Sequence, residues 1–112
     1  MFESEEHLVQ VIAEHDELVR QCQSGHLPFW EFCQKYNDFY AYYALDGHES
    51  DEEERVLLER HDALIEPHRL IAYDILARVC SDSDALLESY KQAGRFGSNE
   101  ALNLLKNVKL GA

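Results

Sequence analysis

The stretch from Phe29 to Tyr43 repeats aromatic and apolar residues every three or four positions, and this spacing constrains the fold more than any other feature. At about 100° per residue, these side chains fall within about one third of a helical circumference. The pattern therefore predicts a helix over residues 28–45 with one buried face. That face consists of Phe29, Phe32, Cys33, Tyr36, Phe39, Tyr40 and Tyr43. Trp30 and Tyr42 lie off it, so we expect both to point toward solvent or toward a partner.

The rest of the chain shows the same helical spacing, and no strand pattern competes with it. Residues 5–23 form the first predicted helix, with Ser4 at its start. A long helix is predicted over 51–80, where Ser50 and Glu53 have the spacing of a capping box. Shorter helices follow over residues 81–93 and 99–109. The sequence thus predicts an all-α fold, a compact bundle of four to five helices forming one domain over residues 1–112.

Pro67 interrupts the long helix predicted over residues 51–80. Proline lacks the backbone N–H that a helix interior needs, and it disfavours helical geometry at the preceding residue, Glu66. We therefore expect a kink or break near Pro67, within residues 63–67. Because the apolar residues keep their phase across the proline, the same face should stay buried on both sides.

Three histidines, His15, His61 and His68, lie on faces that the helical spacing predicts to be buried. A buried imidazole without a hydrogen-bond partner is costly, so each should have a polar partner within the fold. A pH-sensitive or metal-binding cluster is the alternative interpretation of these histidines.

The chain is strongly acidic, and its charge is unevenly distributed. Its 22 Asp and Glu residues against 10 Lys and Arg give a formal net charge of −12. Residues 1–66 hold 17 acids and 4 bases, whereas residues 67–112 hold 5 acids and 6 bases. Such a charge argues against direct binding of nucleic acid or an anionic membrane through a basic face. A charged partner should instead be a basic protein.

Carboxylates are concentrated between the second and third predicted helices, at Asp46, Glu49, Asp51, Glu52, Glu53 and Glu54. In one interpretation, Asp51, Glu52 and Glu53 are ordinary first-turn acids that interact favourably with the helix macrodipole. In the other, the cluster forms a negative patch that attracts a cationic partner. The predicted partner-binding residues are Asp46, Glu49, Asp51, Glu52, Glu54, Trp30 and Tyr42.

No motif in the sequence indicates a catalytic residue, a metal site or a cofactor, and we predict none of the three. Two alternatives to a binding protein stay open. Glu14-x-x-Glu17 and Glu59-x-x-Asp62 resemble the paired acidic motifs of all-helical nucleotide pyrophosphatases, which hold magnesium. The second alternative is a self-associating structural protein.

The sequence also predicts a compartment. Three cysteines without a Cys-x-x-Cys spacing are expected to be buried thiols in a reducing environment. No apolar run reaches the ~18 residues that span a bilayer, and the first residues do not resemble a signal segment. We therefore expect a cytoplasmic protein.

The segment from Gly25 to Phe32, followed by Tyr36 and Tyr40, resembles a pattern of glycine, short turn, Glu-Phe and tyrosines. That pattern is similar to the one in small helical immunity proteins that protect bacteria against ribonuclease toxins of the colicin D type. The resemblance covers residues 18–66, and the C-terminal third contributes nothing to it. It implies a cytoplasmic inhibitor that blocks the basic active site of a toxin by imitating substrate phosphates.

Overall fold

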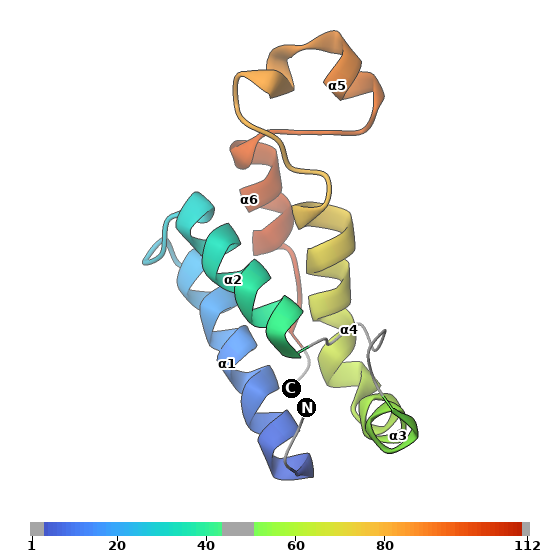
Figure 1. Cartoon of the computed structure of the whole chain (residues 1–112). Coiled ribbons are helices and arrows are strands. Elements are labelled where there is room, and N and C mark those ends of the chain that lie inside the picture. Colours follow the sequence, from blue (N-terminus) through green and yellow to red (C-terminus); the bar gives the residue numbers. More distant parts are fainter. Residues whose placement is uncertain (1–3, 44–50, 111–112) are drawn as a thin grey trace.

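The computed structural model describes residues 4–43 and 51–110. Within these residues the chain forms six α-helices and two short helical segments of other types, so the predicted all-α bundle is confirmed (Figure 1). The elements are α1 (Glu5–Gln23), α2 (Phe29–Tyr43), α3 (Glu52–Arg60), α4 (Asp62–Leu70), the π-helix η1 (Ile71–Leu76), the 3-10 helix η2 (Asp84–Leu86), α5 (Glu88–Gln92) and α6 (Ser98–Lys106).

Helices α1 and α2 lie side by side in opposite directions, and a short turn joins them (Figure 1). The Ser4 hydroxyl accepts the backbone N–H of His7 at 3.1 Å and caps α1. Gly25 has a φ of 85°, a left-handed conformation that costs other residues about 1 kcal/mol or more. Its lack of a side chain allows the chain to reverse within a few residues.

The aromatic face of α2 forms much of the core, as its spacing predicts. Phe29, Phe32, Cys33, Tyr36 and Tyr40 are buried, while the side chain of Phe39 is half-buried. Tyr43 belongs to α2, but its side chain lies outside the described part of the structure. The same core cluster contains buried side chains from α1, α3, α4, η1 and α6: Leu8, Ile12, Val19, Leu58, Ile65, Ile71, Ile75, Ala101 and Leu105.

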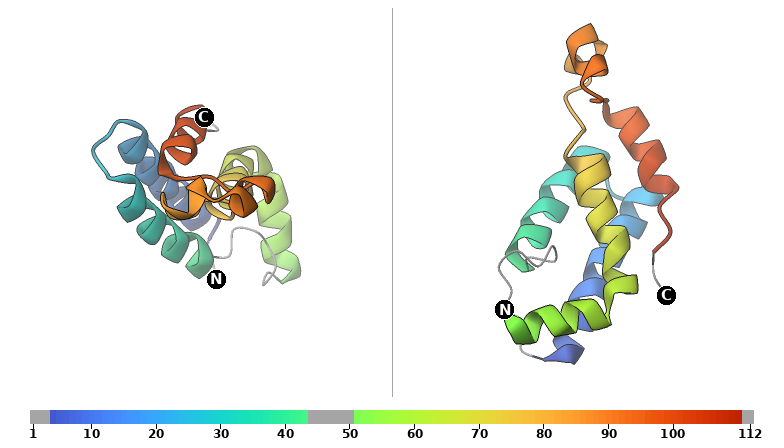
Figure 2. Two further views of the ribbon diagram at one scale, coloured as in Figure 1. Left: turned by 90° about the horizontal axis from the view of Figure 1, so that it is seen from above. Right: turned by 90° about the vertical axis from the view of Figure 1, so that its right-hand side faces the viewer.

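The predicted break in the third helix is present, but it lies at His61, before the interval 63–67. His61 separates α3 from α4 with φ and ψ of −105° and 22°, and Figure 2 shows α3 running across the direction of α4. Pro67 itself lies inside α4. Two contacts to the start of α1 hold the corner, because both Arg60 and His61 bind the Glu5 carboxylate. A contact across more than fifty residues leaves no trace in local sequence spacing.

The start of α3 differs from the predicted capping box by one residue. Asp51 is the N-cap, and its Oδ1 accepts the backbone N–H of Glu54 at 2.9 Å. Ser50, which the sequence pattern placed in this role, lies outside the described residues.

Residues 81–97 form an arm that projects from one end of the bundle (Figures 1 and 2). The single helix predicted over 81–93 is instead two short helices, η2 and α5, separated by an extended Leu87. Neither helix buries a side chain, so no apolar face directs a continuous helix there. The arm returns to the bundle where Cys80 N–H donates to the Phe96 carbonyl at 2.8 Å.

The last predicted helix is also present and is slightly shorter than residues 99–109. It buries Ala101 and Leu105, and its C-terminal end is tied to α1 because the Gln23 side-chain amide donates to the Leu105 carbonyl at 2.9 Å. Across residues 4–43 and 51–110, no helix is both long enough and apolar enough to cross a membrane.

Candidate functional site

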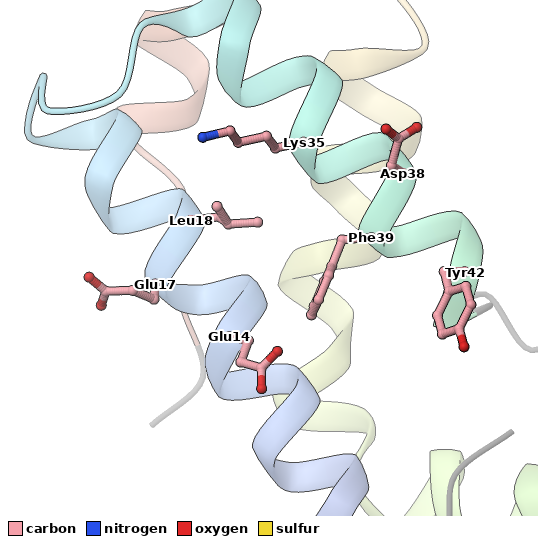
Figure 3. A pocket seen from close by; sticks show the side chains of 7 residues that line it. All are labelled: Glu14, Glu17, Leu18, Lys35, Asp38, Phe39 and Tyr42. Atoms are coloured by element: carbon pink, nitrogen blue, oxygen red, sulfur yellow. The ribbon is translucent and has the colours of Figure 1, made fainter.

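A groove of about 710 Å³ runs between α1 and α2 on the surface of the bundle. Its lining residues on α1 are Glu14, Glu17 and Leu18. Figure 3 shows Phe39 of α2 reaching in between the two helices, while the Glu17 carboxylate points outward from α1. The lining residues on α2 are Lys35, Asp38, Phe39 and Tyr42. Their spacing of three or four residues places them on one face of the helix. An apolar floor thus lies between acidic margins.

The charged groups on the margins of the groove are exposed, and three of the four are carboxylates: Glu14, Glu17 and Asp38. The fourth is Lys35, whose Nζ lies 3.6 Å from the carboxylate of Glu31 one turn away. This ion pair offsets part of the lysine charge, so the local field at the groove is negative.

A buried polar chain joins three helices of the bundle. Asp16 on α1 accepts a hydrogen bond from His68 Nε2 on α4 at 2.6 Å. The Tyr36 hydroxyl on α2 lies 2.7 Å from His68 Nδ1 and donates to it when the imidazole is neutral. His68 and Tyr36 are fully buried. Burial lowers the pKa of His68, against the opposing effect of the Asp16 hydrogen bond, and burial also raises the pKa of Tyr36.

His15 connects this chain to the floor of the groove. Its Nδ1–H donates to the Val11 carbonyl at 2.8 Å, and its ring lies edge-on to His68 with centroids 5.5 Å apart. The Phe39 ring covers it on the groove side, with centroids 4.0 Å apart. Burial lowers the pKa of His15 to about 3. The predicted burial of His15 and His68 is therefore confirmed, with polar partners inside the fold.

His61 is half-buried at the corner between α3 and α4. Its Nε2 lies 2.7 Å from Glu5 Oε1, and the Arg60 guanidinium donates to both oxygens of the same carboxylate at 3.2 Å. The hydrogen bonds from His61 and Arg60 lower the pKa of Glu5. The three histidines thus divide between a buried pair, His15 and His68, and a separate structural corner.

The predicted acidic patch is described only in part. Asp46 and Glu49 lie outside the described residues. Asp51, Glu52 and Glu53 are exposed at the first turn of α3, while Glu54 is half-buried. Because Asp51 caps the helix with one oxygen, Glu52 and Glu53 are the more available carboxylates of this turn.

The two predicted aromatic anchors are exposed but lie far apart. The exposed fraction is 46% for Trp30 and 73% for Tyr42. Trp30 lies in the first turn of α2, where its ring meets the edge of Phe29 with centroids 5.3 Å apart. Twelve residues of helix separate it from Tyr42, which is about 18 Å along the axis. Tyr42 contributes to the groove, and Trp30 does not.

The groove includes residues that sequence reasoning did not assign to partner binding. The spacing predicts Phe39 on the buried face and Glu14 and Glu17 in an acidic pair motif, and it predicts no role for Leu18, Lys35 or Asp38. The signal available in the sequence was the i, i+3, i+7 spacing of Lys35, Asp38 and Tyr42 beside the core face. The α1 side of the groove could not be predicted in this way, because it depends on how α1 and α2 pack against each other.

The three cysteines are buried free thiols, as expected. Burial raises the pKa of Cys22 to about 11 and that of Cys33 to about 12. Both are therefore protonated at neutral pH and pack as small apolar side chains.

Within residues 4–43 and 51–110, no three His, Cys, Asp or Glu side chains gather as a metal site. Glu14 and Glu17 line the groove, whereas Asp62 pairs with Arg69. The nucleotide pyrophosphatase alternative stays a prediction.

No family model matches this chain, and no curated protein or solved structure is detectably similar to it.

Proposed function

We propose that this chain is an acidic helical binding protein that masks a basic partner in the cytoplasm. Its best-fitting role is that of an immunity-type inhibitor of a nuclease toxin. The observation that supports the proposal most directly is the exposed acidic turn at the start of α3, with Glu52 and Glu53 directed to solvent beside the capping Asp51. The net charge of −12 adds a long-range attraction for a cationic surface.

Carboxylates on one helical turn suit the active site of a nuclease because such a site must attract phosphates. An enzyme that cuts nucleic acid presents lysine and arginine side chains along its cleft. The carboxylates of Glu52, Glu53 and Glu54 can occupy the places of substrate phosphates, and Asp46 and Glu49 are proposed to extend the same set. Tyr42 is proposed as an apolar anchor, a role in which tyrosine is enriched at interfaces.

The test is a capture experiment from the native cell lysate with three versions of the protein as bait. The first is the unchanged chain, and the second carries Glu52→Lys and Glu53→Lys in the first turn of α3. The third carries Glu88→Lys and Glu100→Lys, which also lie in first helical turns and make the same change in charge. Circular dichroism and thermal unfolding check that all three are folded.

The proposal predicts that one basic protein binds stoichiometrically at low salt and is released at moderate salt. The α3 reversals should weaken its binding at least about tenfold, because attraction becomes repulsion at close range. The control reversals should change it much less. Binding that is equal for both charge-reversed baits would contradict the α3 surface, and a captured nuclease must also lose activity when the unchanged protein is added.

Self-association is a second candidate function, and one observation favours it. The arm exposes Leu86 and Leu87 to 77% and 50%, an apolar pair at the tip of a projecting segment. Sedimentation equilibrium of the unchanged chain and of a Leu86→Ser, Leu87→Ser variant tests it. A dimer that dissociates in the variant supports this function, whereas a monomer in both cases excludes it at the concentrations measured.

A further inference from the structure

We infer that the groove between α1 and α2 holds a basic amphipathic helix of the protein partner. The apolar face of that helix would lie on Leu18, Phe39 and Tyr42, and its lysine or arginine side chains would meet the carboxylates of Glu14, Glu17 and Asp38 (Figure 3). The inference rests on the proposed function, since it specifies which kind of segment of a basic partner is bound and where.

Charge selects a basic occupant over a second copy of this chain. The groove presents three exposed carboxylates and one lysine, and that lysine is paired with Glu31. A second copy brings a further charge of −12 to the same surface, which opposes self-association through it. A cationic segment gains attraction at the margins and buries the apolar floor at the same time.

The backbone hydrogen bonding of the two groove walls favours a bound helix over a bound extended segment. Both walls are α-helices, and the backbone N–H groups of their lining residues donate within each helix. An extended peptide would therefore find no strand edge to pair with, and its own backbone groups would lie unsatisfied against apolar side chains. A helix satisfies its backbone internally and presents only side chains.

The dimensions of the groove define how much of that helix is in contact. The lining residues on α2 extend from Lys35 to Tyr42, seven residues or about 10 Å along the axis. A partner helix lying along it therefore contacts the groove through about two turns. The expected recognition pattern is apolar residues at i, i+3 or i+4, and i+7, flanked on both sides by lysine or arginine.

The experiment uses the full chain and a synthetic amphipathic helix of about four turns, with leucine on one face and lysine on the other. A second peptide has glutamate in place of every lysine. Binding is measured by titration calorimetry and mapped by changes in backbone amide NMR shifts. The expected result is saturable binding of the lysine peptide with shifts centred on Leu18, Phe39 and Tyr42, and no binding of the glutamate peptide.

Two variants test the two components of recognition. Glu14→Lys with Glu17→Lys reverses the α1 margin, and we expect at least about a tenfold loss of affinity. The matched control, Glu88→Lys with Glu100→Lys, should lose less than about threefold. Tyr42→Ala removes part of the floor at a side chain that is 73% exposed, so folding should be unaffected while affinity falls by about threefold or more.

Other outcomes overturn the inference. Shifts centred on α3, or equal losses in the Glu14, Glu17 variant and its control, would mean that the peptide follows net charge and not the groove. Groove amides that shift on dilution of the protein alone would assign the surface to a second copy.

The failure of this inference can be told apart from failure of the proposed function by using the Glu14→Lys, Glu17→Lys chain as a further bait. If the α3 reversals release the captured partner and these do not, the groove is not the docking site, but the inhibitor proposal stands. If neither pair of reversals differs from the control pair, both ideas are overturned.

Discussion

The bundle of α1, α2 and α4 and the arm of residues 81–97 are both helical, but different interactions hold them. In the bundle, Tyr36, His68 and Phe32 are completely buried, and a chain of hydrogen bonds joins the three helices. In the arm, no side chain of η2 or α5 is buried. Hydrogen bonds at its base hold it in place. The difference teaches that helical content alone does not indicate where the stability of this chain lies.

The largest expected contrast compares truncation of a side chain in each region. Phe32→Ala removes a fully buried ring and should reduce the free energy of unfolding by about 3–5 kcal/mol. Leu86→Ala in the arm should change it by less than about 0.5 kcal/mol because Leu86 is 77% exposed. Urea unfolding at neutral pH measures both. Similar losses of unfolding free energy in the two variants would contradict the claim that the bundle, and not the arm, carries the stability of the chain.

Substitutions in the buried chain of Asp16, His68 and Tyr36 should reduce the free energy of unfolding by a smaller amount. Asp16→Ala leaves His68 Nε2 buried without its acceptor and should cost about 3 kcal/mol. Asp16→Asn keeps a carbonyl oxygen that can accept the same hydrogen bond, so its loss should be smaller. Unfolding curves of the two variants decide the matter, and a larger loss for the asparagine variant would contradict this account of the contact.

As pH falls, the bundle should lose stability before the arm does. Burial lowers the pKa values of His15 and His68 in the folded chain, so the unfolded chain binds more protons once pH falls below the ordinary histidine pKa of about 6.5. The contribution of each buried neutral histidine to the free energy of unfolding is therefore fully present above that pH. Below it, the contribution falls by about 1.4 kcal/mol per pH unit for each histidine. For His15 the loss continues toward pH 3.

The measurement for this prediction is the free energy of unfolding between pH 7 and 5, above the range in which the carboxylates titrate. Residues 81–97 contain no histidine, so local hydrogen exchange of the arm, corrected for intrinsic rates, should respond little in the same window. His15→Phe should reduce the pH dependence of unfolding. A flat pH profile in the unchanged chain would show that these imidazoles are not held neutral by burial.

The smallest effect is expected at the base of the arm. A Cβ at Gly97 would lie 2.7 Å from Asp82 Oδ1, the oxygen that accepts the Ser98 backbone N–H at 2.8 Å. Gly97→Ala should displace that carboxylate and cost about 1 kcal/mol, the usual value of an N-cap hydrogen bond. Hydrogen exchange at the first turn of α6 measures the loss. Asp82→Ala should cost about the same, and the double variant should add little to either.

Periodicity is sufficient to predict α1, α2 and α6, because each buries side chains along one face. The helix predicted over 51–80 is instead divided at His61 into α3 and α4. The bounds predicted for the first helix agree with α1, and the aromatic face of α2 is the core. The arm was predicted as one helix because capping signals such as Ser81 and Gly94 were present. No buried face enforces that helix, and the extended Leu87 divides it.

The site was less predictable than the fold, because it depends on contacts between distant residues. The exposure of Trp30 and Tyr42 follows from their position on a helix. The groove, however, requires Leu18 of α1 to face Phe39 of α2, and the corner at His61 requires Glu5. Neither pairing is encoded in local spacing. Asp46 and Glu49 lie outside the described residues, so their proposed role stays a prediction.

The position of Trp30 has a spectroscopic consequence. It is the sole tryptophan of the chain, and it lies in the first turn of α2, about 18 Å along the helix from Tyr42. Its fluorescence emission should therefore stay unchanged when a short helix occupies only the groove. A blue shift on binding of the complete partner would mean that the partner extends along the whole of α2. One emission spectrum thus measures how far along this helix a bound protein reaches.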